Sequence, residues 1–247
     1  MAEPSPKRRE AGLDPSLAEQ HRYWDARWDR SRTPNEWQLR QGDAILHFVE
    51  PLALERPKIL DIGCGTGWFT GRLARLGPAV GIDLSATAIE MARTQHPGIT
   101  FIAGNLFETP LPAGHFDLIV SQEVIAHVKD QAGLLDRIAD ALRPGGYLVI
   151  TTANKLVMDR IDFGPDPDAH IKQWLDLKRL KRLLHPRFDV LRSTSVMPMG
   201  DRGFLRIVNS PRLNGALSAV IPGRYIETIK ERAGLGYTLV ALAQRKP

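Results

Sequence analysis

The sequence predicts an α/β fold, in which a mostly parallel sheet carries helices on both faces. Residues 59–62 form a short apolar run that is typical of a buried strand, and a glycine-rich turn and a helical pattern follow it. Residues 79–82 form a second such run, which ends at Asp83. Because further apolar runs alternate with helical patterns along the chain, the strands are expected to lie parallel, with helices connecting them.

Three glycines at alternate positions, Gly63, Gly65 and Gly67, shape the turn after the first strand. Glycine is needed where a bound nucleotide lies against the backbone, or where φ is positive. Asp83 stands at the tip of the next strand, where a carboxylate accepts both hydroxyls of a ribose. A dinucleotide-binding turn has its third glycine one residue later, at the position of Trp68. The turn is therefore less well shaped for a pyrophosphate.

Residues 58–70 resemble motif I of the class I S-adenosylmethionine-dependent methyltransferases. That motif consists of two apolar residues, an acidic residue, an apolar residue and Gly-x-Gly-x-Gly, and this sequence matches it throughout, with Asp61 as the acidic residue. The Leu-Arg-Pro-Gly-Gly-Tyr join at 142–147 resembles the last motif common to the family, so the resemblance covers about 58–150. It implies a Rossmann-like sheet of seven strands, the last one antiparallel, with S-adenosylmethionine as cofactor and S-adenosylhomocysteine as product.

The resemblance also implies which residues hold the cofactor. Asn105 stands where the family usually has Asp, and its side-chain oxygen can still accept from the adenine amino group, while Leu106 offers its backbone N–H to the ring. Ser121 and Gln122 are expected to face the methionine end. Arg40 is expected either to reach the methionine carboxylate or to lie on the surface. The other implied cofactor residues are Asp61, Gly63, Cys64, Gly65, Gly67, Asp83 and Leu84.

Length and composition indicate one cytoplasmic domain. The 247 residues, 43% of them hydrophobic, suffice for an α/β domain with a core of ordinary size. Cys64 is the only cysteine, so no internal disulfide forms and a reducing compartment is expected. No apolar run approaches the ~18 residues of a membrane span, and the first ten residues lack the apolar core of a signal peptide. The expected divisions are a disordered tail at 1–14 and a single domain at 15–247, with N-terminal helices at 15–50, the cofactor-binding core at 58–153 and a substrate-side part at 154–247.

Apolar periodicity and turn residues place the elements within these divisions. The predicted helices are 36–49, 68–76, 86–95, 131–142 and 177–184, besides one that begins near Ser16. The predicted strands are 59–62, 79–82, 99–103, 116–120, 147–152, 188–196 and 237–243. Residues 154–170, which are rich in Asp, Gly and Pro, are expected to form an irregular loop.

Aromatic residues crowd the first of these helices, which carries Tyr23, Trp24 and Trp28. An aromatic helix ahead of a nucleotide-binding fold suggests a flap that covers the site and excludes water. The alternative is a helix that only packs against the domain. The N-terminal helices of the family often close over cofactor and substrate, which favours the flap.

Charge is divided unevenly along the chain, whose net charge is +5. Residues 1–150 carry 16 basic and 19 acidic residues, whereas 151–247 carry 17 and 9. A basic C-terminal part can face an anionic substrate, an acidic carrier or a lipid surface. Because the charges alternate with apolar residues at helical spacing, solvated helix faces are the simpler interpretation.

About forty residues separate the sixth and seventh strands, more than the connection requires. Between 200 and 235, apolar residues alternate with arginines, which predicts two short amphipathic helices. These helices are expected to roof the substrate pocket, to pair with a second subunit, or to lie on a membrane through 203–232. The chain is accordingly expected to be a monomer or a homodimer, with no integral membrane segment.

The segment after the fourth strand bears on the methyl acceptor. Residues 121–128, Ser-Gln-Glu-Val-Ile-Ala-His-Val, resemble the segment in which ubiquinone-type small-molecule O-methyltransferases carry an acidic residue, an apolar pair and a histidine. Enzymes that methylate adenine or glutamine carry an Asn-Pro-Pro-Tyr type tetrad there, and its absence argues against nucleic acid as partner. The resemblance thus implies a small-molecule acceptor. A hydroxyl oxygen is the favoured target, with N- or C-methylation and a non-catalytic cofactor-binding module as alternatives.

Methyl transfer to a hydroxyl needs a group that takes up a proton. His127 and His170 are the candidate catalytic residues, the latter because it ends the loop after the fifth strand and matches a histidine of the ubiquinone-type enzymes. Glu123 and His127, four residues apart on an expected helix, are an alternative pair of metal ligands. No acidic or histidine cluster completes that set, so no metal is expected. An NAD-dependent oxidoreductase is the rival enzyme class, and it would need a glycine at position 68.

Overall fold

A computed structural model describes residues 14–30, 33–161 and 170–247. The predicted N-terminal tail, apart from Asp14, lies outside the described residues, as does much of the loop predicted at 154–170. Among the helices that the model describes, none combines the length and the apolar character needed to cross a bilayer.

A single seven-stranded sheet has the strand order β3-β2-β1-β4-β5-β7-β6. Strands β1 to β5 pair in parallel, whereas β7 runs antiparallel to both of its neighbours, β5 and β6. The predicted antiparallel last strand is therefore confirmed. The strands are β1 Ile59–Ile62, β2 Ala79–Asp83, β3 Thr100–Ala103, β4 Phe116–Gln122, β5 Leu142–Ala153, β6 Phe188–Pro198 and β7 Gly236–Arg245.

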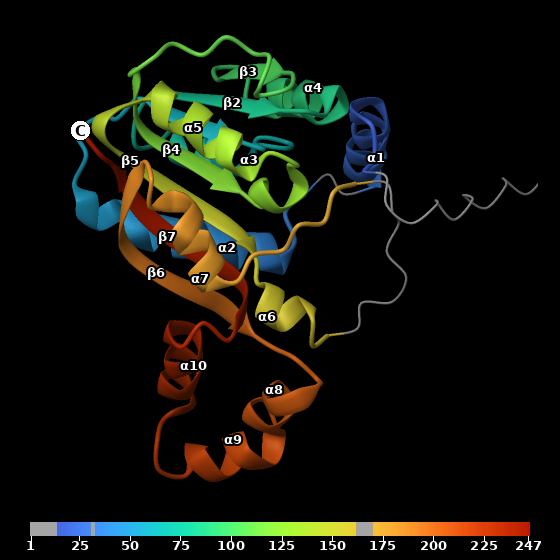
Figure 1. Cartoon of the computed structure of the whole chain (residues 1–247), viewed down its shortest axis with the longest axis vertical. Coiled ribbons are helices and arrows are strands. Elements are labelled where there is room, and N and C mark those ends of the chain that lie inside the picture. The colour runs from blue at the N-terminus through green and yellow to red at the C-terminus, as the bar shows by residue number, and fades with distance from the viewer. Residues whose placement is uncertain (1–13, 31–32, 162–169) are drawn as a thin grey trace, which may run out of the picture.

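Helices cover both faces of the sheet (Figure 1). On one face, α5 and α7 contribute leucines and an isoleucine to a core cluster that contains Leu60, Ile119 and Leu148; on the other, α2 and α3 pack on Leu118 and Val149. Neighbouring strand residues thus point to opposite faces, as the pleat requires. The helices are α1 Leu17–Arg30, α2 Glu36–Val49, α3 Trp68–Leu73, α4 Ala86–Gln95, α5 Gln131–Ala141, α6 Lys155–Met158, α7 Leu177–Leu184, α8 Gly203–Val208, α9 Pro211–Ser218 and α10 Gly223–Arg232, with short 3₁₀ turns η1 Glu50–Leu52 and η2 Ile125–His127.

Side-chain caps explain why the predicted starts of two helices are confirmed. The Asn35 side chain accepts from the Gln38 N–H and the Gln38 side chain accepts from the Asn35 N–H, which closes a capping box at the start of α2. Asp176 likewise accepts from the Arg179 N–H at the start of α7, over 2.7 Å.

The structure differs from the predicted elements in several places. Helix α6 lies inside the segment expected to be an irregular loop, because Asn154 caps it by accepting from the Leu156 N–H. The segment between β6 and β7 forms three helices rather than two, since Pro211 starts a new helix after α8. Strand β5 also begins five residues earlier than predicted, at Leu142, and pairs there with Phe116.

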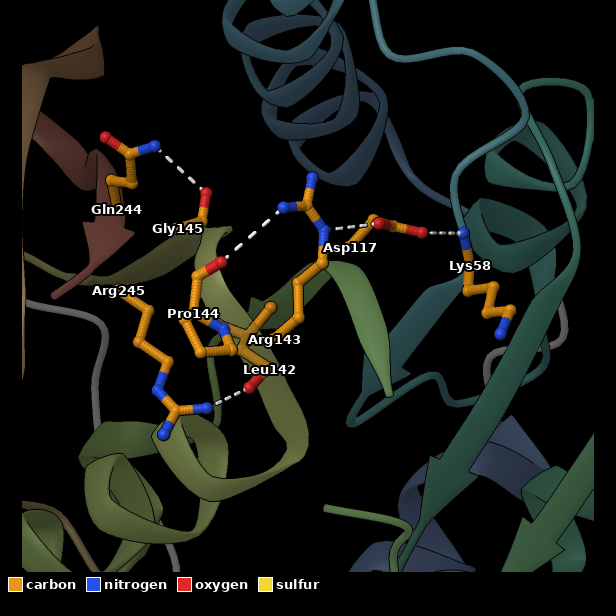
Figure 2. Close-up of polar contacts among 8 residues, drawn as sticks. All are labelled: Lys58, Asp117, Leu142, Arg143, Pro144, Gly145, Gln244 and Arg245. Carbon is orange, nitrogen blue, oxygen red and sulfur yellow. Dashed lines mark hydrogen bonds and ion pairs between the residues drawn. The ribbon is translucent and has the colours of Figure 1, made fainter. Parts of the chain in front are cut away.

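A polar network ties the strands together at the end of the sheet where β1, β4 and β5 begin (Figure 2). Asp117 accepts from the Lys58 backbone N–H over 2.8 Å and from Nε of Arg143 over 2.6 Å. The Gln244 side chain of β7 donates to the Gly145 carbonyl over 2.9 Å, and Arg245 donates to the Leu142 carbonyl. These contacts fix the strand starts and leave the opposite end of the sheet for the site.

At that opposite end, Asp61 of β1 is fully buried. Its Oδ2 accepts from the Thr70 hydroxyl over 2.7 Å, whereas Oδ1 has no hydrogen-bond partner within the described residues. Burial raises the pKa of Asp61 from 3.8 to about 7, although the Thr70 hydrogen bond opposes the shift. The folded protein therefore holds this proton at pH values where the unfolded chain releases it.

The first prediction concerns the pH dependence of stability. Between pH 4 and 7 unfolding releases the Asp61 proton, so the free energy of unfolding falls as the pH rises. Asp61→Asn is expected to remove up to about 1.4 kcal/mol per pH unit from that slope, the value for one proton. Urea titrations at several pH values measure it. Asp117→Asn is the control, because the pKa of Asp117 is not raised; equal slopes in wild type and Asp61→Asn would contradict the prediction.

Candidate active site

The glycine turn after β1 has a backbone that side chains would obstruct. Gly63, Gly65 and Gly67 have φ values of +74°, +53° and +77°. A Cβ on Gly63 would lie 2.3 Å from Cγ2 of Val124, and one on Gly67 would lie 2.8 Å from the Phe101 ring. The turn therefore needs glycine both for its conformation and for the close approach of its neighbours.

Asp83 at the end of β2 is bound to this turn. Its Oδ2 accepts from the Gly65 N–H over 2.8 Å, and its Oδ1 accepts from the Ser85 N–H over 2.8 Å. Burial raises the pKa of Asp83 above its ordinary value, while the Ser85 and Gly65 hydrogen bonds oppose the shift. Each carboxylate oxygen keeps further acceptor capacity, which a pair of hydroxyls can use.

A cavity of about 680 Å³ lies over the ends of β1, β2 and β4. A cavity at the carboxyl ends of parallel strands is the usual ligand site in an open α/β sheet, and this volume suits a nucleoside-sized ligand with a second molecule beside it. The predicted site residues that line it are Gly63, Cys64, Asp83, Leu84, Asn105, Leu106, Gln122, His127 and His170.

Five other predicted residues do not line the cavity. Asp61 and Ser121 are fully buried behind it, and Gly67 lies at the start of α3. Gly65 is covered by the Trp28 ring, since a Cβ there would lie 2.5 Å from it. Arg40 is exposed on α2, where its charge acts on Glu231 of α10, and the structure does not bring it to the cavity.

The residue after Arg40 does line the cavity. Gln41 is buried, and its Nε2 donates to Oγ1 of Thr238 over 2.7 Å and to Oε1 of Glu123 over 3.2 Å. Successive residues of a helix point about 100° apart, so a one-residue difference separates a core position from a surface one. The helical periodicity of 36–49 contained that signal.

Helix α1 forms the wall of the cavity opposite the sheet. Leu17, Tyr23 and Trp24 are among its residues that line the cavity. The helix is held against α4 by Asp25, whose Oδ1 accepts from the Ser85 hydroxyl over 2.5 Å and from the Thr87 N–H over 3.3 Å. The structure thus combines the two expectations for this helix, since it packs on the domain and covers the site; its movement as a flap stays a prediction.

Two histidines meet inside the cavity among aromatic rings. The His127 and His170 ring centroids are 5.1 Å apart, and Tyr23 of α1 stacks on His170 with centroids 4.2 Å apart and planes inclined by 19°. The rings of Trp24 and Trp174 approach His127 edge-on, at 5.0 and 5.6 Å. The sequence separation of 43 residues gave no sign of this contact, which the Asn154–Leu175 bridge and the position of α1 create.

The tautomer of His127 follows from its partner. Nδ1 of His127 lies 2.8 Å from the carbonyl oxygen of Ile171. A carbonyl only accepts, so Nδ1 carries the proton in the neutral ring and Nε2 is left as an acceptor. Neutral His127 is therefore in the form that can take up a proton.

Glu123 is a further cavity residue, which the sequence reasoning considered only as a metal ligand. It follows β4 directly, has a φ of +55°, and its Oε1 accepts from Gln41 and, over 3.3 Å, from the Thr151 hydroxyl. Burial raises its pKa from 4.5 to about 7, against the effect of hydrogen bonds from Thr151 and its other neighbours. An acidic residue directly after a parallel strand was the signal that could have identified it.

The expectation that Glu123 and His127 lie four residues apart on one helix is wrong. Glu123 precedes the short η2 turn, in a left-handed conformation that no α-helix contains. Among the described residues, no three His, Cys, Asp or Glu side chains gather in a way that could hold a metal ion.

The helices between β6 and β7 do not line the cavity. Its lining comes from α1, α2, α3, α5, the strand ends and the segments after β3, β4 and β5, and none of the described lining residues belongs to α8, α9 or α10. The expectation that this segment roofs the substrate pocket is therefore not met. The alternatives of a second subunit and a membrane surface remain.

Solved structures of an S-adenosylmethionine-dependent methyltransferase and of a cyclase share this fold. A crystal structure of an S-adenosylmethionine-dependent methyltransferase from Mesorhizobium loti covers 81% of this chain and 96% of its own, with a TM-score of 0.57 and 23% identity. The cyclase SpnF covers 96% and 98%, with a TM-score of 0.64 and 17% identity. Likeness at these identities concerns the fold alone.

Proteins with similar sequences are also named as methyltransferases. A family model described as "Methyltransferase domain" matches residues 60–150. A probable S-adenosylmethionine-dependent methyltransferase of Mycobacterium tuberculosis is 31% identical over 138 residues, which are 56% of this chain and 48% of the relative. A ubiquinone biosynthesis O-methyltransferase of Albidiferax ferrireducens is 32% identical over 136 residues, 48% of this chain and 54% of the relative.

The chain spans about half the length of these curated relatives. The shared segment is the one that builds the glycine turn, the Asp83 strand tip and the floor of the cavity. This segment matches the methyltransferase domain family in sequence, and the chain shares the fold of an S-adenosylmethionine-dependent methyltransferase, which together support a class I S-adenosylmethionine-dependent methyltransferase.

Proposed function

We propose that the protein transfers a methyl group from S-adenosylmethionine to a hydroxyl oxygen of a small molecule. The observation that carries this proposal is the cavity that joins Asp83 and the glycine turn at one end to His127, His170 and Glu123 at the other. The first group suits a nucleoside and the second can take up a proton. One cavity thus offers both functions that the reaction needs.

The residues present fit the cofactor. Asp83 has spare acceptor capacity for the ribose hydroxyls, while Gly63 and Cys64 present backbone without a large side chain to the cavity. Asn105 uses its Oδ1 to accept from the Phe107 N–H over 3.1 Å and its Nδ2 to donate to Glu108. A carbonyl oxygen has two lone pairs, so the adenine contact expected of Asn105 stays available.

The chain's own part in the reaction is to position, to exclude water and to move a proton. When bound, the cofactor supplies an electrophilic methyl group on a sulfonium. The aromatic wall formed by Tyr23, Trp24 and Trp174 shields the cavity and can hold a planar acceptor. Nε2 of neutral His127 and the carboxylate of Glu123 are both able to accept the hydroxyl proton.

Two alternatives use the same cavity. N- or C-methylation of a small molecule would need the same alignment, and an amine acceptor would need no base. A non-catalytic module would need the cofactor end alone. The half-buried Glu123, whose pKa is raised, and the two imidazoles in the same cavity favour catalysis, because perturbed acids and bases cluster where protons are moved.

The second prediction tests the cofactor end. Asp83→Ala removes the ribose acceptor and releases the Gly65 N–H, so it is expected to weaken S-adenosylmethionine binding by about 1–3 kcal/mol. Calorimetry measures the affinity. Asp43→Ala, an exposed carboxylate paired with Arg72, is the matched control and should bind normally. Unchanged affinity in Asp83→Ala, with a melting temperature like that of the wild type, would contradict the assignment.

The third prediction separates the candidate bases. S-adenosylhomocysteine release is first screened against a panel of phenols, enols and amines to find an acceptor. With a hydroxyl acceptor, removing the base should lower turnover by about 10²- to 10⁴-fold. The variants are His127→Ala, His170→Ala and Glu123→Gln.

The pH profile shows which group is the base. A base works only when deprotonated, so turnover rises with pH through its pKa. If Glu123 is the base, the acidic limb should lie near pH 7, the value to which burial raises its pKa, and Glu123→Gln should abolish it. If a histidine is the base, its alanine variant should lose that limb. Retained rates and limbs in all three variants would favour an amine acceptor held by position.

The fourth prediction is that turnover needs no metal. The described residues offer no complete ligand set, and a sulfonium methyl needs no Lewis acid. Dialysis against a chelator should leave turnover unchanged. Loss of activity that magnesium or zinc restores would show that Glu123 and His127 bind a metal after all.

A further inference from the structure

Helices α8, α9 and α10 form an exposed unit, here called the helical projection (residues 203–232). In Figure 1 it extends below the edge strand β6, away from the wall that α1 forms over the cavity. Within the three helices only Leu205, Ile226 and Lys230 are buried, and α9 has no buried residue. The exposed large apolar side chains are Phe204, Ile207, Leu213, Leu217, Val220, Tyr225 and Ile229.

The degree of exposure calls for a covering partner. Val220 is 85% exposed, Ile207 66% and Ile229 59%. Isolated helices shorter than about 12–15 residues are marginal in water and depend on packing of an apolar face, and these helices have six, eight and ten residues. Their apolar side chains nevertheless face outward, so most of the stabilisation that burial would bring is unused.

Charge indicates which partner fits. The projection carries a net positive charge, with five basic residues, Arg206, Arg212, Arg224, Lys230 and Arg232, against two acidic ones, Glu227 and Glu231. Helix α7 is also basic, but its Leu180 and Leu184 are fully buried, so its charges lie on an ordinary solvated face. The projection thus combines a net positive charge with large exposed apolar side chains.

We propose that the helical projection docks on an anionic lipid surface. Arginines bind the head groups, while Phe204, Ile207 and Val220 enter the boundary between head groups and acyl chains, as in amphipathic helices that lie on membranes. A second copy fits less well, because a two-fold contact through this face would bring together two surfaces that each carry five basic and two acidic residues. Aliphatic tips such as Val220 have no counterpart on a nucleic acid backbone.

The projection adjoins the cavity through α6. Met158 at the end of α6 lines the cavity, and two residues later the Arg160 guanidinium lies 5.4 Å from the Phe204 ring centroid. The Arg160 carbonyl also accepts from the Asp201 N–H over 3.1 Å. The docked surface would therefore lie beside one rim of the cavity, although the proposal does not depend on methyl transfer.

Flotation of the full chain with vesicles tests the proposal. Binding is expected to vesicles of equal parts phosphatidylglycerol and phosphatidylcholine, and not to phosphatidylcholine alone. It should weaken on going from about 0.1 M to about 1 M salt, where the screening length falls from ~10 to ~3 Å. Arg206→Gln/Arg212→Gln should lower affinity by about 30-fold, which is ~1 kcal/mol for each arginine, and Ile207→Glu/Val220→Glu should abolish binding.

A matched variant and two other measurements decide between the occupants. Lys178→Gln/Arg179→Gln on α7 removes the same charge and should stay within about twofold of the wild type, since its site lies outside the docked face. Melting curves like that of the wild type would show that the variants are folded. No binding to the mixed vesicles, or an equal loss in the α7 control, overturns the proposal. The proposal is also overturned if the protein is a dimer in solution that Ile207→Glu/Val220→Glu dissociates. It is overturned as well if the protein binds an oligonucleotide, only the arginine changes abolish that binding, and vesicle binding persists.

Discussion

The hydrogen bond from the Gly65 N–H to the Asp83 carboxylate fixes the end of the sheet on which the site is built. It joins the turn after β1 to the tip of β2, and the Gly63 and Cys64 N–H groups strengthen the join by donating to the Ile82 carbonyl. The backbone must take positive φ values to make these contacts, so the turn excludes side chains and leaves room above it. The position of α1 depends on the same arrangement, since Trp28 packs on Gly65 and Asp25 accepts from the Ser85 hydroxyl.

Burying ionised carboxylates at this end of the sheet costs free energy. Burial raises the pKa values of Asp61, Asp83 and Glu123, which means that the folded chain disfavours their charged forms. Asp61 and Asp83 also raise the pKa of the Cys64 thiol, after burial itself. A cationic ligand held among these carboxylates would favour their ionised forms and offset part of the burial cost. A site that is unfavourable when empty and favourable around a cation thus gains affinity for a positively charged cofactor.

Local signals predicted most of the fold because each of them acts over a few residues. The bounds of α2 follow from the Asn35 capping box and those of α7 from Asp176, and the apolar runs locate all seven strands. The cofactor end of the site was predictable for the same reason, since glycine spacing and a strand-tip carboxylate are local.

The end of the site that contains the two histidines and Glu123 was not predictable in this way. The stacking of Tyr23 on His170 joins segments 147 residues apart, and the raised pKa of Glu123 depends on burial that only the assembled sheet creates. Arg40 differs from the cavity residue Gln41 by one helical position, a distinction that the helical periodicity of 36–49 did contain.

The basic residues of the C-terminal part lie on two surfaces, which differ in how their apolar side chains are buried. On α7 the leucines face the core and the charges face water, as the sequence pattern alone suggested. On the projection, contacts with the rest of the chain lie at α8 and α10. Leu205 of α8 is fully buried. The Ser195 hydroxyl of β6 donates to the Glu231 carbonyl of α10 over 2.7 Å and accepts from the Gly236 N–H of β7 over 2.8 Å. This anchors the C-terminal end of α10 between β6 and β7, whereas α9, with nothing buried, lies at the far end of the unit. Local stability should therefore decrease from α10 toward α9. Helix α9, which has no buried residue, is followed closely by the exposed Val220, so an external surface would stabilise this part of the projection.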